Sequence, residues 1–335
     1  MTEAQMSFLE GVTAQPGNLR DAAGTMRDAL AETDLAPLRG DGTVVFCGIG
    51  ASWHALLPAV RALRRAGRRA FAVTAPELAT SREAADAYVL ISQSGASTET
   101  LEALEATGDA PRYVVSAKGD SPLAQSGRWL PLGPRPDTAL STLSYTATLQ
   151  ALGILCEVLA PGSDQTDWEA VAGLFAAGLE RHRPDAELLA AQLTTARALD
   201  AIAETASLGS AGESSLLARE GLHLAAGFEE TRQYLHGPLE SVGEGFCCLL
   251  FGSGRELQLA ESLASYGASA CVVTASDAPA PFGAHAIRIP AVTELAAPIL
   301  QVLPVQLAVA SAGETLGLPL RELMRQQPDT KTVEP

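Results

Sequence analysis

The sequence predicts two similar α/β domains in tandem, each a doubly wound parallel sheet covered by helices. Short, uniformly apolar segments alternate with alanine-rich segments of helical length, which is typical of strands buried on both faces of a parallel sheet. The chain has 335 residues, enough for about two domains at ~150 residues per domain. The pattern of the first half also recurs in the second half.

Eight apolar segments are the predicted strands. Those of the first half are 44–50, 87–95, 112–119 and 128–133. Those of the second half are 206–212, 245–254, 269–277 and 285–291. Each half is predicted to close with a long apolar helix, at 141–160 in the first and at 294–317 in the second.

Three pairs of positions align the two halves with nearly the same offset. They are Gly48 with Gly209, Ser94 with Ser253, and Ser116 with Thr274. An offset maintained over three landmarks indicates a duplicated domain. The predicted organisation is a leading helical segment 1–38, a first domain 39–163, a mostly helical connector 164–203, a second domain 204–320 and a C-terminal tail 321–335.

Composition and charge exclude several classes of protein. The formal net charge is −16, so the overall field repels nucleic acid and anionic membranes, and neither is an expected partner. The five cysteines lie in apolar segments without the spacing of a zinc or redox site, as core thiols of a reducing compartment do. No signal peptide or membrane span is recognisable, because the N-terminus is acidic and the apolar segment 296–312 is broken by proline and glutamine. We expect a cytoplasmic protein.

Small polar residues follow three predicted elements of the first half, in segments 48–52, 92–98 and 141–142. The carboxyl ends of parallel strands meet at one edge of a sheet, where ligands bind. Serine and threonine hydroxyls, with backbone N–H groups at a helix N-terminus, suit a phosphate dianion, and Gly50 lets the backbone approach it closely. Any one of these loops is also explained by helix capping and turn formation. Three loops at one edge indicate an anion site.

The second half lacks this chemistry. Its counterpart of the SQSG segment 92–95 is FGSG at 251–254, which favours one phosphate per chain. The chain contains neither a P-loop nor a dinucleotide-binding glycine motif. We therefore expect no nucleotide cofactor, and no metal.

Four motifs, in this order along the chain, resemble the signature of the sugar-isomerase (SIS) domain family. They are GIGAS (48–52), SQSG (92–95), LST (140–142) and HGP (236–238). The resemblance runs from about Phe8 to Glu334 and is closest to the isomerase half of glucosamine-6-phosphate synthase and to stand-alone aminosugar-phosphate deaminase/isomerases. It implies two flavodoxin-like SIS domains without a glutaminase domain. It also implies the substrate-binding residues: Ser52, Ser92, Gln93, Ser94 and Ser97 for the sugar phosphate, and Ala51, Ala139 and Ser141 for the sugar hydroxyls.

Three further residues are candidates for proton transfer: Glu220, His236 and Lys331. From the sequence alone, each of these residues can also be interpreted as a solvated surface group without a function. His236 lies on a loop, Glu220 on a helix and Lys331 near the end of the chain. However, only two of the 23 basic residues are lysine, so the position of Lys331 invites a chemical explanation. The resemblance implies that His236 opens the sugar ring in the site of a neighbouring subunit of a homodimer. It implies that Glu220 is a site carboxylate and that Lys331 folds over the open-chain sugar.

Two departures from the family pattern concern the reaction itself. Leu143 stands where relatives have lysine, and segment 222–227 has no partner for the family's proton-shuttling glutamate. Glu229, Glu230 or Glu240 could replace it, and spacing does not choose among them. The resemblance implies a sugar-phosphate isomerase or deaminase acting on a ketose or 2-aminosugar phosphate through an enediol or enolamine. The alternatives are a non-catalytic phosphosugar-binding sensor and a fructosamine-phosphate deglycase.

Overall fold

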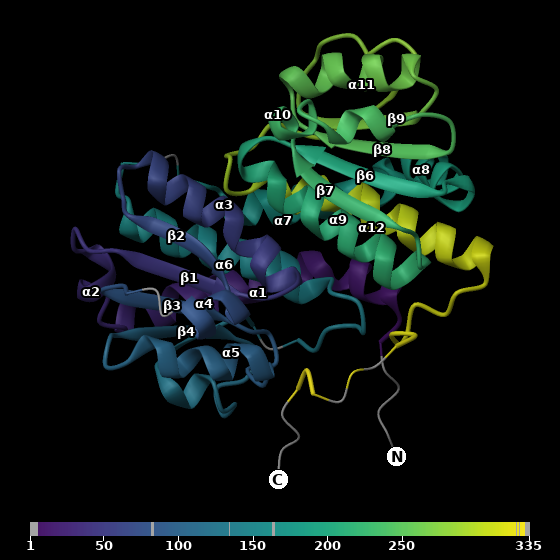
Figure 1. Cartoon of the computed structure of the whole chain (residues 1–335). Helices are drawn as coiled ribbons and strands as arrows, with labels where there is room; N and C mark the ends of the chain where they lie inside the picture. Colours follow the sequence, from purple (N-terminus) through teal and green to yellow (C-terminus); the bar gives the residue numbers. More distant parts are fainter. Residues whose placement is uncertain are drawn as a thin grey trace, which may run out of the picture. The chain divides into compact units, whose positions relative to one another are not determined.

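The chain builds two parallel sheets of five strands each (Figure 1). The structure is a computed structural model that describes residues 6–81, 84–133, 135–162, 165–325, 327 and 329–331. It divides into two compact units, one around each sheet. The sheet-1 unit comprises 17–136, 143–169 and the described residues from Arg325 to Lys331; the sheet-2 unit comprises the described residues up to Pro16, Asp137–Thr142 and Ala170–Met324.

The first sheet has the strand order β2-β1-β3-β4-β5, which is the doubly wound order of flavodoxin-like folds. Its strands are β1 (Val44–Gly48), β2 (Ala70–Thr74), β3 (Ala87–Ile91), β4 (Arg112–Ser116) and β5 (Arg128–Pro131). Its helices are α2 (Ala36–Arg39), α3 (Ala51–Arg65), α4 (Ala75–Ser81), α5 (Thr98–Glu102), η1 (Ala103–Thr107), η2 (Ala124–Ser126) and α6 (Leu143–Leu159). Strands β1 and β3 are buried at every residue because they have neighbours on both sides and helices on both faces.

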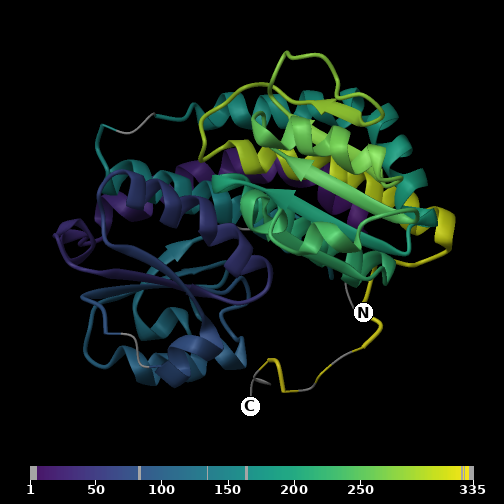
Figure 2. The ribbon, with the colours of Figure 1, turned by 45° about the horizontal axis from the view of Figure 1, so that its top comes forward.

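The second sheet has the order β10-β9-β8-β6-β7, which is the same topology started from the opposite edge. Its strands are β6 (Ala198–Ala203), β7 (Ala226–Glu230), β8 (Phe246–Phe251), β9 (Ser269–Thr274) and β10 (His285–Arg288). Its helices are α8 (Arg183–Thr195), η3 (Thr205–Ser207), α9 (Leu208–Leu222), α10 (Thr231–Tyr234), η4 (Pro238–Ser241), α11 (Arg255–Ser265) and α12 (Ala297–Leu316). Figure 2 shows the yellow helix α12 running behind the green strands of this sheet. The predicted fold class is confirmed.

Two helices begin in one unit and end in the other. They are α1 (Phe8–Glu32) and α7 (Trp168–Arg181). The predicted boundaries, which assume continuous domains, stay a prediction. The leading segment is helical over most of its length, as predicted.

The predicted strand at 206–212 is wrong, because this segment forms η3 and the start of α9. Its alanine, serine and glycine residues lack the β-branched and aromatic side chains that favour strands. The strand that was not predicted is β6, which lies in the segment predicted as a mostly helical connector. The pairing of Gly48 with Gly209 is therefore wrong as well; the counterpart of the end of β1 is Ala203, the last residue of β6.

The other two landmark pairs occupy corresponding places. Ser94 and Ser253 follow β3 and β8, the third strands of their sheets in chain order, and Ser116 and Thr274 end β4 and β9. The edge strands β2 and β7 were not predicted. Only part of each is buried. β7 contains two glutamates and so shows no uniform apolar run, whereas β2 is a short apolar run that was overlooked.

The two long apolar helices are confirmed as α6 and α12, within the predicted ranges. By length and composition α12 could cross a membrane, but 72% of its apolar window is buried inside the protein, as in a core helix. Its buried glutamines have partners: Gln301 accepts a hydrogen bond from Ser210 at 2.7 Å, and Gln306 accepts one from Gln15 at 2.7 Å. The side-chain oxygens of both glutamines are therefore satisfied inside the sheet-2 unit.

Candidate functional site

The loop after β1 leads directly into the N-terminus of α3. Gly50 is the N-cap residue, and Ala51 and Ser52 occupy the first turn, both half-buried. The first N–H groups of a helix have no partner inside it and carry partial positive charge. The start of α3 can therefore bind an anion, with the hydroxyl of Ser52 as a further donor.

The loop after β3 carries four of the predicted phosphate ligands, Ser92, Gln93, Ser94 and Ser97. The hydroxyls of Ser92 and Ser97 lie 3.0 Å apart, so the loop closes on itself at its two ends. The hydroxyl of Ser94 accepts a hydrogen bond from the backbone N–H of Ala96 at 3.2 Å. The carbonyl of Gln93 accepts one from Ala117 at 3.0 Å, which ties the loop to the end of β4. These contacts hold three serine hydroxyls on one short loop.

Gly95 determines the shape of this loop. Its φ is +65°, a conformation that residues with a side chain rarely adopt. A Cβ atom at this position would lie 2.0 Å from the hydroxyl oxygen of Ser121. The backbone of Gly95 therefore packs directly against Ser121, and no larger residue fits there.

Lys331 lies beside the same loop. Lys331 and Ser97 form an antiparallel backbone bridge, and the N–H of Thr98 donates to the carbonyl of Thr330 at 3.3 Å. The side chain of Lys331 is exposed. The structure thus brings one predicted proton-transfer residue next to the predicted phosphate loop, within the sheet-1 unit.

The remaining predicted site residues belong to the sheet-2 unit. Ala139 and Ser141 are half-buried in the segment Asp137–Thr142. Glu220 is half-buried in the last turns of α9, and His236 is exposed on the turn after α10. The predicted site residues are therefore divided between the two units.

Asp137 is a structural residue of this segment that was not predicted. Its carboxylate accepts hydrogen bonds from the N–H of Thr138 at 2.8 Å, and from the N–H and the hydroxyl of Thr142 at 3.1 and 2.8 Å. These bonds fold 137–142 into a tight turn that contains Ala139 and Ser141. Asp137 lies six residues before the start of α6 and does not cap this helix, so no local sequence signal marks it.

Glu213, on α9, is the second residue that was missed. Its side chain is fully buried. Burial raises the pKa of this carboxyl well above its usual value, and the charge of Asp137 raises it further. Glu213 therefore holds its proton at pH values where an ordinary glutamate has lost it. No sequence signal marks it, because burial depends on what packs around α9.

The three glutamates considered as replacements for the missing base differ in their surroundings. The carboxylate of Glu230 caps α10 by accepting hydrogen bonds from the N–H groups of Arg232 and Gln233, at 3.0 and 2.9 Å. Glu229 and Glu240 are exposed, on β7 and on η4. Because Glu230 is engaged in a cap, Glu229 and Glu240 are the better candidates of the three.

The loop after β8 is the counterpart of the phosphate loop in the second sheet. The buried carboxylate of Glu256 fills it: Oε2 accepts a hydrogen bond from the N–H of Gly254 at 3.3 Å. A Cβ atom on Gly252 would lie only 2.3 Å from this oxygen. The chain's own carboxylate thus occupies the loop that corresponds to the predicted phosphate loop of the first sheet.

The thiols do not form a reactive or metal-binding site. All five cysteines are described residues, and all are buried free thiols. Burial raises the pKa of Cys47 and of Cys247 to about 12, so both stay protonated. Within the described ranges, no cluster of three or more His, Cys, Asp or Glu side chains could hold a metal ion.

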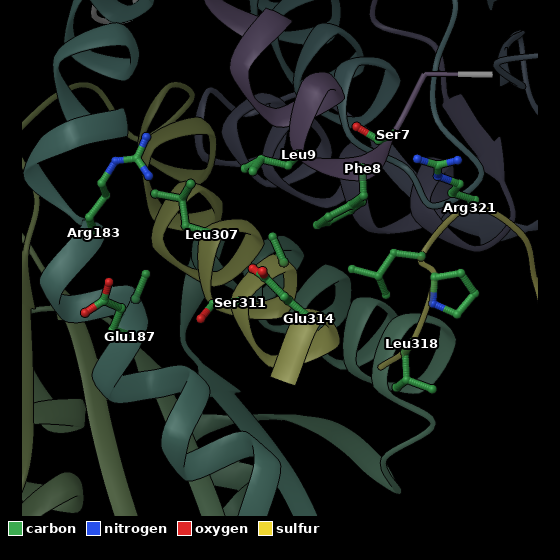
Figure 3. A pocket seen from close by; sticks show the side chains of 14 residues that line it. Ser7, Phe8, Leu9, Arg183, Glu187, Leu307, Ser311, Glu314, Leu318 and Arg321 are labelled. Carbon is green, nitrogen blue, oxygen red and sulfur yellow. The ribbon is translucent and has the colours of Figure 1, made fainter. Parts of the chain in front are cut away.

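A hollow of about 500 Å³ lies in the sheet-2 unit (Figure 3). The start of α1, the helix α8, the last turns of α12 and the segment after α12 surround it. Phe8, Leu9 and Leu307 give it an apolar wall, and Glu187 and Glu314 add carboxylates. None of the residues predicted to bind sugar phosphate lines this hollow.

Two doubly wound sheets of the same order, with a serine-rich loop after the third strand of the first, define the tandem sugar-isomerase (SIS) fold. Solved structures confirm this fold. The C-terminal domain of glucosamine-fructose-6-phosphate aminotransferase from Francisella tularensis superposes with a TM-score of 0.83 and 18% identity, covering 94% of this chain and 97% of that one. Glucosamine-6-phosphate deaminase from Thermotoga maritima gives 0.78 and 18%, covering 96% and 98%. Tagatose-6-phosphate ketose/aldose isomerase from Escherichia coli gives 0.79 and 18%, covering 98% and 95%.

Curated relatives are similar in sequence, and they confirm the resemblance drawn from the motifs. The chain is 27% identical over 319 residues to the isomerizing glutamine–fructose-6-phosphate aminotransferase of Pyrobaculum aerophilum, covering 90% of this chain and 53% of the relative. It is 23% identical over 286 residues to the enzyme of the same name from Sulfolobus acidocaldarius, covering 80% and 47%. The chain thus spans about half the length of the curated relatives it matches. No family model matches the chain.

Proposed function

We propose that the chain is a sugar-phosphate isomerase or deaminase that acts on a ketose or 2-aminosugar phosphate. The observation that carries the proposal is the backbone pairing of Lys331 with Ser97. It joins a lysine, which can form a Schiff base, to a loop whose hydroxyls suit a phosphate. The fold shared with proteins named as phosphosugar isomerases and deaminases supports the same conclusion.

The proposed reaction needs two proton transfers. In the first, His236 gives a proton to the ring oxygen as the anomeric hydroxyl loses one, which opens the ring. In the second, a carboxylate moves a proton from the carbon next to the carbonyl to the carbonyl carbon itself, through an enediol or enolamine; Glu220 is the candidate. Lys331 is proposed to stabilise the open chain through its ammonium group, while the serines of the loop hold the phosphate in place.

We also propose a homodimer in which His236 reaches the site of the neighbouring subunit, and a cytoplasmic location. The exposure of His236 on a turn of the sheet-2 unit supports the first of these, because the imidazole is free to face a second molecule. Sedimentation of the purified protein tests the dimer. Mixing a His236→Gln variant with a Lys331→Ala variant tests the shared site: if His236 and Lys331 of different subunits form one site, some activity returns in the mixed dimers.

A non-catalytic phosphosugar sensor is the second candidate. One observation favours it: α9 ends at Leu222 and β7 begins at Ala226, so no carboxylate occupies the stretch where relatives carry their proton-shuttling glutamate. A sensor would keep the phosphate loop and dispense with turnover. A fructosamine-phosphate deglycase is a variant of the first proposal in which the enolamine releases an amine.

Proton exchange in heavy water tests the proposal directly. Fructose 6-phosphate or glucosamine 6-phosphate is incubated with the protein, and exchange at the carbon next to the carbonyl is followed by NMR. Enolisation predicts exchange that disappears in Glu220→Gln and His236→Gln. Binding of both sugars in a thermal-shift assay without exchange supports the sensor instead. Release of an amine from a fructosamine phosphate identifies the deglycase, and failure of both sugars to bind at millimolar concentration overturns the sugar assignment.

A further inference from the structure

The helix α10 is too short to be stable without help from its surroundings. It has four residues, Thr231–Tyr234, and His236 follows it after one residue. An isolated helix of this length does not form in water. Tertiary contacts of α10 must therefore hold it in place, and with it the turn that carries His236.

The first of these contacts joins α10 to the start of α11. The hydroxyl of Thr231 donates to Oε1 of Glu256 at 2.7 Å, and both side chains are buried. The other oxygen, Oε2, accepts from the N–H of Gly254. Because Glu256 is held at both oxygens, it fixes the N-terminal residue of α10 to the loop after β8.

The second contact joins α10 to the middle of the second sheet. The phenol of Tyr234, which is fully buried, donates to Oδ2 of Asp200 at 2.7 Å. Asp200 lies in β6, between Gly227 of β7 and Cys248 of β8. Burial raises the pKa of the Asp200 carboxyl, whereas the hydrogen bond from Tyr234 acts in the opposite direction. A carboxyl group within a sheet is costly unless it is hydrogen-bonded, so this pair is a specific attachment.

Both ends of α10 are thus attached to the sheet-2 unit, and the turn that follows is short. The N–H of His236 donates to the carbonyl of Gln233 at 3.0 Å, and Pro238 begins η4 immediately afterwards. The backbone of His236 is therefore fixed relative to α10, while its ring is exposed.

We propose that Thr231 and Tyr234 are positioning residues that fix the imidazole of His236 through their buried hydrogen bonds to Glu256 and Asp200. The inference rests on the proposed function for the role of His236 in opening the sugar ring. It adds that the second sheet holds this acid–base group in place. In this sheet, Glu256 fills the loop that corresponds to the predicted phosphate loop of the first sheet.

Thr231→Val and Tyr234→Phe test the proposal, because each removes one hydroxyl and little else. Thr315→Val and Tyr266→Phe are the matched controls, since both residues are exposed on helix ends of the same unit. The first measurement needs no activity: it is NMR of the imidazole C–H groups of the five histidines, with the His236 signals assigned from a His236→Gln variant. We expect the His236 signal to shift or broaden in both test variants and to stay unchanged in both controls.

The second measurement is the rate of proton exchange. We expect this rate to fall by about tenfold or more in each test variant, with KM nearly unchanged, because a small misplacement of a reacting group slows turnover. Thr231→Ser keeps the hydroxyl and should restore both the signal and the rate. If Tyr234→Phe does not fold, Asp200→Ala replaces it, because it removes the acceptor of the phenol's hydrogen bond; the His236 signal should then shift or broaden as well. Asp200→Asn, which can still accept this hydrogen bond, is its control and should keep the His236 signal close to that of the wild type.

An unchanged His236 signal in both test variants overturns the positioning proposal. A wild-type protein without proton exchange overturns the proposed function and leaves the NMR result to decide the positioning. A shifted signal with an unchanged exchange rate shows that α10 is held as described but that His236 does not act in the reaction, and this also overturns the proposal as stated.

Discussion

Lys331 and Ser97 pair through their backbones, although one lies near the end of the chain and the other follows the third strand of the first sheet. The bridge continues in the hydrogen bond from Thr98 to Thr330. Thr330 and Lys331 are therefore attached to the serine loop through their backbones. A change at either residue should affect the other, and the following predictions depend on this arrangement.

Removal of a loop hydroxyl should weaken phosphate binding. We expect Ser94→Ala and Ser52→Ala each to lower the affinity for a sugar phosphate by about tenfold, the cost of one hydrogen bond to a charged group. Isothermal titration calorimetry with fructose 6-phosphate measures it. Ser265→Ala is the control, because this exposed serine at the end of α11 bonds only within its own helix. Equal affinities in all three variants would place the phosphate elsewhere.

Lys331→Ala should separate binding from turnover. We expect the affinity for the sugar phosphate to change by less than about threefold, and proton exchange to fall by about tenfold or more. Lys331→Arg keeps the positive charge that is proposed to stabilise the open chain, so it should bind the sugar phosphate like the wild type and regain part of the exchange rate. Lys118→Ala, at the other lysine of the chain, controls for the loss of one charge at the end of β4. Full exchange activity in Lys331→Ala would contradict the role given to this residue.

Gly95→Ala should damage both stability and binding. The new methyl group would meet Ser121, and the positive φ would be strained, so we expect unfolding to become easier by about 1–3 kcal/mol. Urea denaturation measures the change, and calorimetry should show that sugar phosphate no longer binds. Gly24→Ala is the matched control: this glycine lies on α1 with open space around it, and alanine favours a helix. A loss of stability in the control and not in Gly95→Ala would refute this account of the loop.

The buried carboxyl of Glu213 should make the protein easier to unfold as the pH rises. Because its folded pKa is raised above the usual value of 4.5, the folded state binds the proton more tightly than the unfolded state. Its contribution is fully present below about pH 4.5 and is lost as pH rises toward the folded pKa, with a slope of at most about 1.4 kcal/mol per pH unit.

Comparison of the wild type with Glu213→Gln isolates this contribution. Urea denaturation at a series of pH values above 4.5 should show the wild type losing stability relative to Glu213→Gln as pH rises. Glu314→Gln changes an exposed glutamate and should run parallel to the wild type. If the curves of the wild type and Glu213→Gln stay parallel over the whole range, the carboxyl of Glu213 is not held in its protonated form.

The central strands were predictable because burial on both faces makes their sequences apolar throughout. This applies to β1, β3, β8 and β9. In contrast, β6 contains Asp200, whose partner Tyr234 is distant in sequence, so the segment does not resemble a buried strand. The small residues of 206–212 were predicted to form a strand, but the segment is helical. Alanine, serine and glycine by themselves do not decide between the two.

The serine loop was predictable for a different reason: its serines and glycine are contiguous, and contiguous residues keep their spacing in any fold. What the sequence by itself determined is therefore the fold class, the positions of most strands and the existence of a serine-rich loop from Ser92 to Ser97. The tertiary structure alone decided the bridge from Lys331 to Ser97, the burial of Glu213 and the attachment of α10 through Glu256 and Asp200. Each of these depends on which distant segments pack together, and packing, not local sequence, sets burial and the pairing of polar groups.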